Sequence, residues 1–340
     1  MAKPPLSMKP TGWFQVAWSA EIGVGDVRTM KYFDREMIAW RAESGIVTVM
    51  DAYCEHLGAH LGYGGTVQGE VIQCPFHGWQ WSQDGRNVCI PYAKRPNRGR
   101  RIRTYPTVER NESVYIWHDI DGAEPYFDVP DIFADFDDDK TAADYYPQMT
   151  LYKPGLELHP QYILENGVDS AHFKYVHQTP IVPVFTRHDF VEPVSYVDFT
   201  ITFEGDHQQS IGDVNSGVEA INGGLGVAVT KSWGMVDNRT ISAITPVDAS
   251  TSDVRFMVYI GRTPAKDPAR AEAKAREFGQ EVIRQFLQDV HIWSHQRYSD
   301  PPALCAAEYD GFTAIRNWAK QFYPDGIGGS AAEAYAAQKG

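Results

Sequence analysis

Cysteine is scarce in this sequence. Four cysteines among 340 residues are too few for a disulfide framework, so their spacing is informative about metal binding or catalysis. Only Cys54 and Cys74 have a histidine close by. Cys89 and Cys305 stand alone, and we expect them to be small, buried apolar side chains.

Positive charge and long apolar runs are also lacking. Lysine and arginine number 31 against 44 acidic residues, and the net charge of −13 argues against broad binding to nucleic acid or to an anionic membrane. No run approaches the ~18 apolar residues of a membrane-spanning helix, and the first residues lack the apolar stretch of a signal peptide. We therefore expect a cytoplasmic protein without a membrane span that acts on a small molecule.

The chain is long enough for two domains, and its pattern changes near residue 120. Short apolar or alternating runs between about 28 and 119 are separated by Gly, Asn and Asp turns, which predicts a small antiparallel β domain. The stretch from about 120 to 150 is acidic and interrupted by prolines, as in a linker that crosses between domains. We predict domains at 1–120 and 121–340. The tail is rich in small residues and is expected to be partly disordered.

Beyond the linker, the pattern predicts a sheet faced by a long helix. A helix is expected near 161–176, and a long helical segment covers about 268–298. Alternating runs between them predict strands at 194–205, 240–247 and 254–262. This arrangement is typical of an α+β domain.

Two short motifs each place one cysteine and one histidine in a glycine-bearing turn. Cys54 and His56 come from CEH, and after seventeen intervening residues CPFH supplies Cys74 and His77. A Rieske [2Fe-2S] cluster needs this mixture, because two cysteines bind one iron and two histidines bind the other. Structural zinc sites also use two Cys and two His, but they usually pair like with like, as C-x2-4-C and H-x3-5-H. A zinc ribbon or a chance cluster is the alternative interpretation.

A second set of candidate ligands lies in ENGVDSAHFKYVH. Asp169 and His172 are helical neighbours, so the carboxylate can hydrogen-bond a metal-bound imidazole. His172 and His177 are five residues apart, which on a regular helix is a rotation of roughly 140°. The helix must therefore bend, bulge or end near Tyr175 if both histidines bind one metal. By itself the pair is a weak signal, because such histidines are more often surface or core side chains.

The third ligand should be a carboxylate from elsewhere in the chain. Non-haem Fe(II) that activates oxygen favours two histidines and one carboxylate, with positions left open for O2 and substrate. On the predicted long helix, an i, i+4, i+7, i+11 stripe contains Val282, Phe286, Asp289 and Trp293. An aspartate on this apolar face is costly unless it is paired or binds a cation. The alternative is a rotated helix with a solvated Asp289.

These segments together resemble the Rieske-type non-haem iron oxygenases. The stretch YCEHLGAHLGYGGTVQGEVIQCPFHGWQW is similar to their cluster-binding segment, N-x2-D-x2-H-x4-H at 166–177 matches their mononuclear-iron segment, and FLQDVHIW matches their carboxylate-bearing helix. The resemblance implies that a Rieske [2Fe-2S] cluster is held by Cys54, His56, Cys74 and His77. It also implies that a mononuclear Fe(II) is held by His172, His177 and Asp289.

The resemblance assigns roles to two further polar residues. Asp169 would bridge toward a cluster histidine of a neighbouring subunit, with Asn166 as a nearby support, which implies a ring, commonly a trimer. A cluster alone would also suit a Rieske ferredoxin or a cytochrome-complex subunit, but either would leave the 220 residues after residue 120 without a role. An electron carrier or redox sensor with a metal-free second domain is the different-class alternative. Iron content separates them, at about three irons per chain against about two.

The carboxy-terminal segments FLQDVHIWSHQRYSDPP and YDGFTAIRNWAKQFY are similar to the oxygenase component of 3-ketosteroid 9α-hydroxylases and, more distantly, to sterol desaturases. The similarity implies a helix-grip α+β catalytic domain that inserts one oxygen atom of O2 into an unactivated C–H bond of a bulky apolar ring substrate. Electrons would come from NADH through a reductase, a ferredoxin or both. A desaturase or demethylase would use the same iron ligands. Residues 180–250, where pocket walls are expected, show no close match, so the substrate stays open.

One basic segment stands out in this acidic chain. AKRPNRGRR, together with one nearby arginine, supplies Lys94, Arg95, Arg98, Arg100, Arg101 and Arg103. One interpretation is a docking patch for an acidic ferredoxin or reductase, because charge complementarity speeds encounter. The alternative is a solvated loop, or one paired with an acidic surface of a neighbouring subunit.

Overall fold

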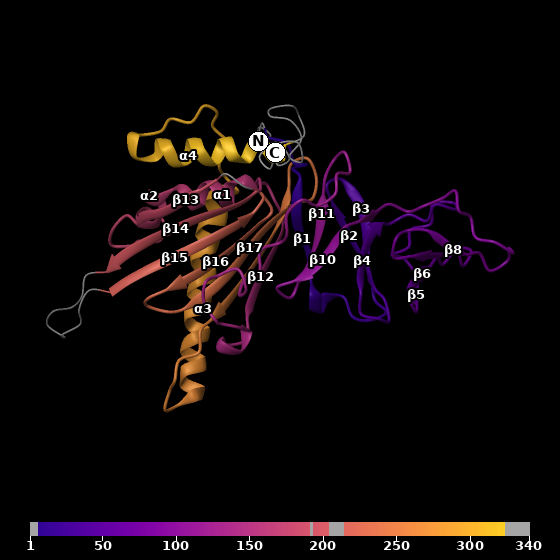
Figure 1. The fold of residues 1–340 in the computed structure, drawn as a ribbon, viewed down its shortest axis with the longest axis horizontal. Helices are drawn as coiled ribbons and strands as arrows, with labels where there is room; N and C mark the ends of the chain where they lie inside the picture. The colour runs from indigo at the N-terminus through magenta and orange to yellow at the C-terminus, as the bar shows by residue number, and fades with distance from the viewer. Residues whose placement is uncertain (1–5, 191–192, 204–213, 324–340) are drawn as a thin grey trace.

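The computed structural model describes residues 6–190, 193–203 and 214–323, and the predicted disordered tail lies outside these residues. The amino-terminal part is a β unit built from three small antiparallel sheets (Figure 1). The first sheet contains β1 (Gly12–Trp18), β11 (Ser113–His118) and β10 (Thr107–Arg110). The second contains β2 (Val27–Tyr32), β3 (Arg35–Arg41), β4 (Val47–Asp51) and β9 (Thr104–Tyr105). The third contains β5 (Thr66–Gln68), β6 (Val71–Gln73), β7 (Gln80–Ser82) and β8 (Asn87–Cys89).

The carboxy-terminal part is one seven-stranded antiparallel sheet with four helices. In spatial order the strands are β12 (Met149–Leu156), β18 (Ser252–Ile260), β17 (Asn238–Pro246), β16 (Val227–Trp233), β15 (Val214–Gly223), β14 (Val194–Phe203) and β13 (Val184–Asp189). The α-helices are α1 (Gln161–Val168), α2 (Ser170–Tyr175), α3 (Pro268–Trp293) and α4 (Ala306–Ala319). Short 3-10 turns occupy η1 (Ser19–Glu21), η2 (Ala142–Asp144) and η3 (Lys320–Phe322). The predicted α+β fold class is confirmed.

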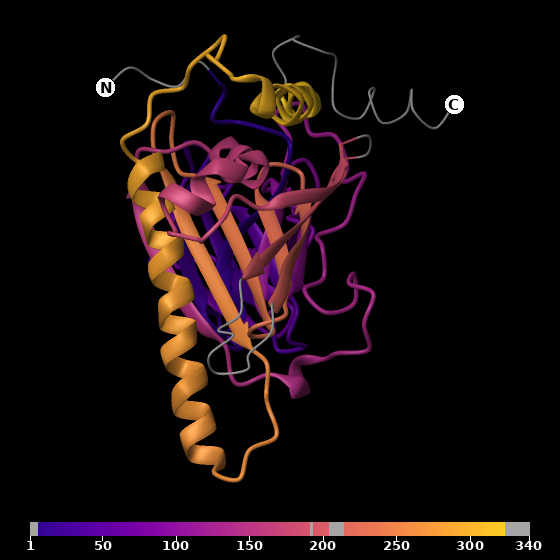
Figure 2. The ribbon, with the colours of Figure 1, turned by 90° about the vertical axis from the view of Figure 1, so that its left-hand side faces the viewer.

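Helix α3 packs along strand β18 on one face of the large sheet. Side chains alternate between the two faces of a strand, and on β18 the residues Val254, Phe256 and Val258 point toward α3. The Phe256 and Phe286 rings stack at 4.2 Å with an interplanar angle of 15°. Figure 2 shows the helix running along the sheet for much of its length. The long amphipathic helix predicted from the sequence is therefore held by its apolar stripe.

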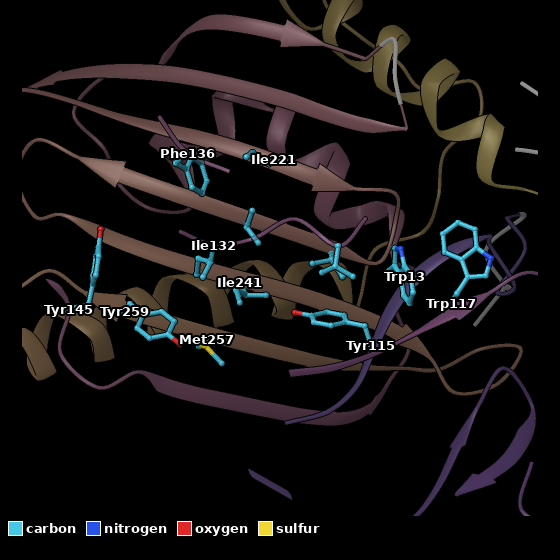
Figure 3. Close-up of a cluster of buried hydrophobic side chains, with 13 residues drawn as sticks. Trp13, Tyr115, Trp117, Ile132, Phe136, Tyr145, Ile221, Ile241, Met257 and Tyr259 are labelled. Atoms are coloured by element: carbon cyan, nitrogen blue, oxygen red, sulfur yellow. The ribbon is translucent and has the colours of Figure 1, made fainter. Parts of the chain in front are cut away.

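The opposite face of the sheet is covered by the amino-terminal unit. Met257 and Tyr259, the alternate residues of β18, join a buried cluster with Trp13 from β1 and with Tyr115 and Trp117 from β11 (Figure 3). The Trp13 and Trp117 rings meet edge to face at 5.5 Å. The central strands β17 and β18 are thus buried on both faces, and the two parts of the chain share one core.

The predicted linker at 120–150 crosses between the two parts, but it is packed against the core rather than hanging free. Its apolar residues, including Ile132 and Phe136, are buried in the cluster of Figure 3. Arg239 on β17 is fully buried and donates to the Asp138 carboxylate at 2.6 and 2.7 Å and to the Ile132 carbonyl at 3.0 Å. The acidic residues of the predicted linker thus alternate with buried side chains that pack on the core. The sequence pattern did not distinguish these two kinds of residue.

Several boundaries differ from the sequence-based expectation. Strand β1 lies before the predicted start of the β region near residue 28, because it pairs with the distant β11. Helix α3 ends at Trp293, earlier than predicted. The expectation that Cys305 is buried is wrong: it is exposed immediately before α4, while Cys89 is half-buried. Among the described residues, no helix combines the length and apolar character needed to cross a membrane.

Candidate metal centres

The two cysteine–histidine motifs fold into matching turns at one edge of the β5–β8 sheet. In the first, the Gly58 amide donates to the Cys54 carbonyl at 2.9 Å, and in the second the Gly78 amide donates to the Cys74 carbonyl at 3.0 Å. Both glycines have left-handed backbones, with φ of 76° and 71°. Other residues rarely adopt this conformation, so each turn needs its glycine.

The two turns bring the four predicted ligands together, with the sulfurs inside and the imidazoles near the surface. Cys54 and Cys74 are each only 2% exposed, whereas His56 and His77 are half-buried and their rings lie 4.8 Å apart. Burial, together with the adjacent Cys74, raises the pKa of the Cys54 thiol to about 11. His77 Nδ1 is buried without a hydrogen-bond partner. A bound metal would displace the thiol proton and satisfy this nitrogen, so the donor set fits a metal cluster.

Trp79 packs over the histidine side of these turns. Its ring is nearly parallel to that of His56, with centroids 4.2 Å apart and an interplanar angle of 7°. Its Nε1 donates to the Tyr92 hydroxyl at 2.8 Å. Trp79 thus packs the cluster turns.

The second candidate site begins with a helix break. Helix α1 ends at Val168 and α2 begins at Ser170, while Asp169 between them has a non-helical backbone. Its Oδ1 accepts from the amides of Ala171 and His172 at 3.1 and 3.2 Å, so it caps α2. The single helix predicted at 161–176 is therefore two helices, and α2 ends at Tyr175, where the spacing of the histidines required a bend or an end.

The break brings His172 and His177 to the same point, where Asp289 projects from α3. His177 Nε2 lies 3.2 Å from Asp289 Oδ2, and the two imidazole rings are 5.2 Å apart at 80°. Asp289 is buried on α3 between Phe286 and Trp293, as the apolar stripe predicted. Two imidazoles and one carboxylate thus converge inside the protein.

Hydrogen bonds orient both rings. His177 Nδ1 faces Gln288 Oε1 at 3.4 Å, and His172 Nδ1 faces the Asp169 carbonyl, while Asn166 Nδ2 lies 3.2 Å from His172 Nε2. Burial lowers the pKa of His172 although Asp289 is near. Burial has the same effect on His177, but the hydrogen bond and charge of Asp289 outweigh it and leave the pKa of His177 raised. Holding the second ring nitrogen in this way is usual for metal-binding histidines.

A cavity of about 180 Å³ opens beside this site, and its walls include Asn166, Asp169, His172 and Asp289. The same cavity is lined by Glu165, which forms a bidentate pair with Arg316 of α4 at 3.0 and 2.9 Å. The pair ties α1, which leads into the helix that carries His172, to α4.

Sequence reasoning missed three supports of this site. Gln288 could have been found by asking which neighbour of Asp289 holds the second nitrogen of His177. The Glu165–Arg316 pair has no sequence signal, because 151 positions separate its members. His159, to which no role was assigned from the sequence, is fully buried just before α1 and joins it to the amino-terminal segment.

His159 should make the fold sensitive to mild acid. Its Nε2 donates to the Ser7 carbonyl at 2.9 Å and its Nδ1 accepts from the Gln161 amide at 3.0 Å, so the neutral ring satisfies both nitrogens. Burial lowers the pKa of His159 to about 4. The unfolded chain, with an ordinary histidine pKa near 6.5, therefore binds a proton first as the pH falls, and stability is lost between about pH 6.5 and 4.

Between pH 7 and pH 5 this histidine should account for about 2 kcal/mol of lost unfolding free energy. Urea unfolding of the wild type and of His159→Asn at both pH values measures the effect. The variant should lose correspondingly less stability over this interval. Equal losses in the two proteins would show that His159 is not the sensitive group.

Comparisons with known proteins match both halves of the chain. Residues 12–106 match the Rieske [2Fe-2S] domain, and residues 116–323 match the 3-ketosteroid 9alpha-hydroxylase C-terminal domain. A probable 3-ketosteroid-9-alpha-monooxygenase oxygenase component of Rhodococcus rhodochrous is 30% identical over 92% of this chain and 80% of its own length. A cholesterol 7-desaturase of Xenopus laevis is also 30% identical, over 94% of this chain and 72% of its own length.

Solved structures show the same fold at lower identity. The NdmA QL mutant of Pseudomonas putida with caffeine superposes with a TM-score of 0.68 at 16% identity, covering 96% of this chain and 93% of that one. Dicamba monooxygenase bound to dicamba gives a TM-score of 0.61 at 16% identity, covering 92% and 97%.

The relatives named as oxygenase components imply a separate electron donor, a reductase or a ferredoxin, and O2 as co-substrate. The resident cofactors of such an enzyme are a Rieske cluster and a mononuclear iron. The chain therefore belongs to the Rieske non-haem iron oxygenases, as a monooxygenase of the 3-ketosteroid 9α-hydroxylase branch.

Proposed function

We propose that this oxygenase hydroxylates an unactivated C–H bond of a bulky apolar ring compound, with a 3-ketosteroid as the first candidate. The observation that carries the proposal is the buried convergence of His172, His177 and Asp289, whose donor atoms lie within 4.8 Å of one another. When bound there, Fe(II) supplies the activation of O2. The steroid is suggested by the names of the 3-ketosteroid monooxygenase relatives.

In this proposal each part of the chain holds one centre. Residues 1–120 would form the electron-transfer domain, with cluster ligands Cys54, His56, Cys74 and His77. Residues 121–340 would form the catalytic domain, with iron ligands His172, His177 and Asp289. Asn166 and Asp169, on the wall of the adjoining cavity, support this second centre.

The surroundings of His177 favour an apolar substrate. The Phe173 ring lies 5.8 Å from His177 and 4.7 Å from Phe199. Nearby, Val184 at the start of the edge strand β13 is 63% exposed, and Ile181 before it is 39% exposed. An aromatic wall at the site and an apolar rim beside it would hold a hydrocarbon ring and exclude water from it.

We also propose that electrons pass between copies of the chain, in a trimer. Figure 1 shows the β5–β8 sheet of the cluster turns at one end of the molecule and helices α1 and α2 toward the other end. Within one copy, the two centres are therefore far apart. Leu57 and Phe76, beside the cluster turns, are 66% and 61% exposed, as expected of a surface that another copy covers. A head-to-tail ring would bring this surface to Asp169 of the next copy.

Desaturation is the second candidate, and the cholesterol 7-desaturase relatives favour it. Its iron ligands would be the same, so only the product can distinguish the two reactions. In hydroxylation the substrate gains one oxygen atom. In desaturation it loses two hydrogens.

A single turnover tests these proposals without the natural electron donor. Chemically reduced protein is mixed with O2 and a panel of 3-ketosteroids and sterols, and the products are read by mass spectrometry. A product heavier by one oxygen supports hydroxylation, and one lighter by two hydrogens supports desaturation. If every compound returns unchanged while both metal centres are loaded, the steroid proposal is wrong.

A further inference from the structure

A cationic segment lies beside the cluster turns, and we call residues 92–101 the basic strap. It contains no acidic residue and carries five positive charges, on Lys94, Arg95, Arg98, Arg100 and Arg101. These side chains are exposed, on a chain whose net charge is −13. Such a concentration of one sign needs a reason, because like charges repel one another.

The strap is held against the cluster-bearing sheet. The buried Asn87 of β8 accepts from the Asn97 amide at 2.8 Å through its side-chain oxygen. Arg101 Nε donates to the Asp84 carbonyl at 2.8 Å. The middle and the carboxy-terminal end of the cationic stretch are thus tied to the hairpin of β7 and β8, so the charges are presented in a defined place.

The strap also touches the cluster turns themselves. Arg100 pairs at 3.6 Å with Glu55, which lies between the two candidate ligands of the first turn. Tyr92, at the start of the strap, is 64% exposed and accepts a hydrogen bond from Trp79, whose ring stacks on His56. Two direct contacts therefore connect an exposed residue of the strap to a candidate cluster ligand.

Most of the strap charge has no ion-pair partner in the part of the chain that the structure describes. Among the described residues, Lys94, Arg95 and Arg98 form no ion pair, whereas Arg100 has Glu55. Unpaired, exposed cations at a fixed position steer an approaching anionic surface over distances of about a Debye length. The exposed apolar tips of the cluster turns, Leu57 and Phe76, carry no charge. They suit an apolar contact rather than an ionic one.

We propose that the basic strap is the docking surface for the protein that delivers electrons to this oxygenase, a one-electron donor with an acidic face. The donor would lie on Lys94, Arg95 and Arg98, and its electron would enter through Tyr92, Trp79 and His56. In each encounter the donor loses one electron and the cluster gains one, and no bond forms or breaks. The proposal rests on the cluster assignment above, and it leaves the tips Leu57 and Phe76 for the neighbouring copy.

Charge reversal tests the strap directly. In Arg95→Glu/Arg98→Glu, neither changed residue touches a candidate ligand. The matched control is Arg270→Glu/Lys274→Glu, which reverses two exposed charges near the start of α3, far from the cluster (Figure 1). The probe is a reduced plant-type [2Fe-2S] ferredoxin, which is strongly acidic. Stopped-flow absorbance of the oxygenase cluster gives the second-order rate of its reduction.

At low salt, the strap variant should be reduced about tenfold or more slowly than the wild type, while the control stays within about twofold. Added salt should slow the wild type and leave the strap variant nearly unchanged. Equal rates in the strap variant and the control would overturn the proposal.

Two further measurements separate electron entry from the other roles of this region. The mass of the assembly should be the same in the strap variant and the wild type. The rate at which O2 reoxidises a photochemically reduced cluster should also be the same in the two proteins. A changed mass would mean that the strap contacts another copy, and the proposal would be wrong. If the wild type lacks a Rieske spectrum, the cluster assignment itself fails, which is a distinct outcome.

Discussion

Replacing Asp289 with alanine is expected to lower the iron content from about three to about two atoms per chain and to reduce product formation by at least about 1,000-fold. The carboxylate is the only anionic member of the three converging donors, so two neutral imidazoles would remain. The fold should survive, because Asp289 lies on an apolar face and its one ion pair is with His177. Iron analysis together with the visible spectrum of the cluster measures both centres in one sample.

A matched control lies on the same helix. Asp267 caps the amino terminus of α3 by accepting from the Arg270 amide at 3.1 Å. Asp267→Ala should cost about 1 kcal/mol of stability and keep all the iron. An iron content in Asp289→Ala equal to that of this control would show that Asp289 is not a ligand.

Removing the charge of Asp169 should lower coupled turnover by about 100-fold or more while both metals stay bound. Coupled turnover is the amount of product formed per electron consumed. Asp169 lies on the cavity wall beside His172, at the place where an electron would arrive from another copy. Its carboxylate also caps α2, which carries His172. An alanine variant alone would therefore confuse electron transfer with a weakened helix.

Comparing Asp169→Asn with Asp169→Ala separates the two roles. Asparagine keeps the side-chain oxygen that accepts from the Ala171 and His172 amides, so α2 stays capped, whereas alanine should cost about 1 kcal/mol. If the carboxylate is needed, both variants lose coupled turnover with unchanged iron content. Near-normal turnover in the asparagine variant would instead make Asp169 a capping residue.

The sequence predicted the candidate metal sites because the chemistry of such sites depends on local spacing. The two turns with Cys54 and Cys74 each close within a few residues, so ligand type and glycine position are visible in the motif. The apolar stripe around Asp289 likewise reflects the regular period of one helix. At all these positions the structure agrees with the pattern.

The parts that sequence reasoning missed depend on contacts between distant segments. Strand β1 was overlooked because its partner β11 begins almost 100 residues later. The break at Asp169 was not predicted, because the sequence spacing between Asp169 and His172 fits two arrangements equally well. Asp169 could cap a helix that contains His172, or both residues could lie inside one longer helix. The apolar residues of the segment at 120–150, such as Ile132, find their places only on a sheet that the rest of the chain builds.

The burial of strands β17 and β18 on both faces has a consequence for biosynthesis. Strands β1 and β11 leave the ribosome well before β18, which is about 130 residues further along, a delay of roughly 7 to 30 s at ordinary rates of synthesis. During that interval the face made by Trp13, Tyr115 and Trp117 has no sheet to cover it. The nascent chain is therefore most prone to aggregate late in translation, and slower growth at low temperature or added chaperone capacity should raise the yield of soluble protein.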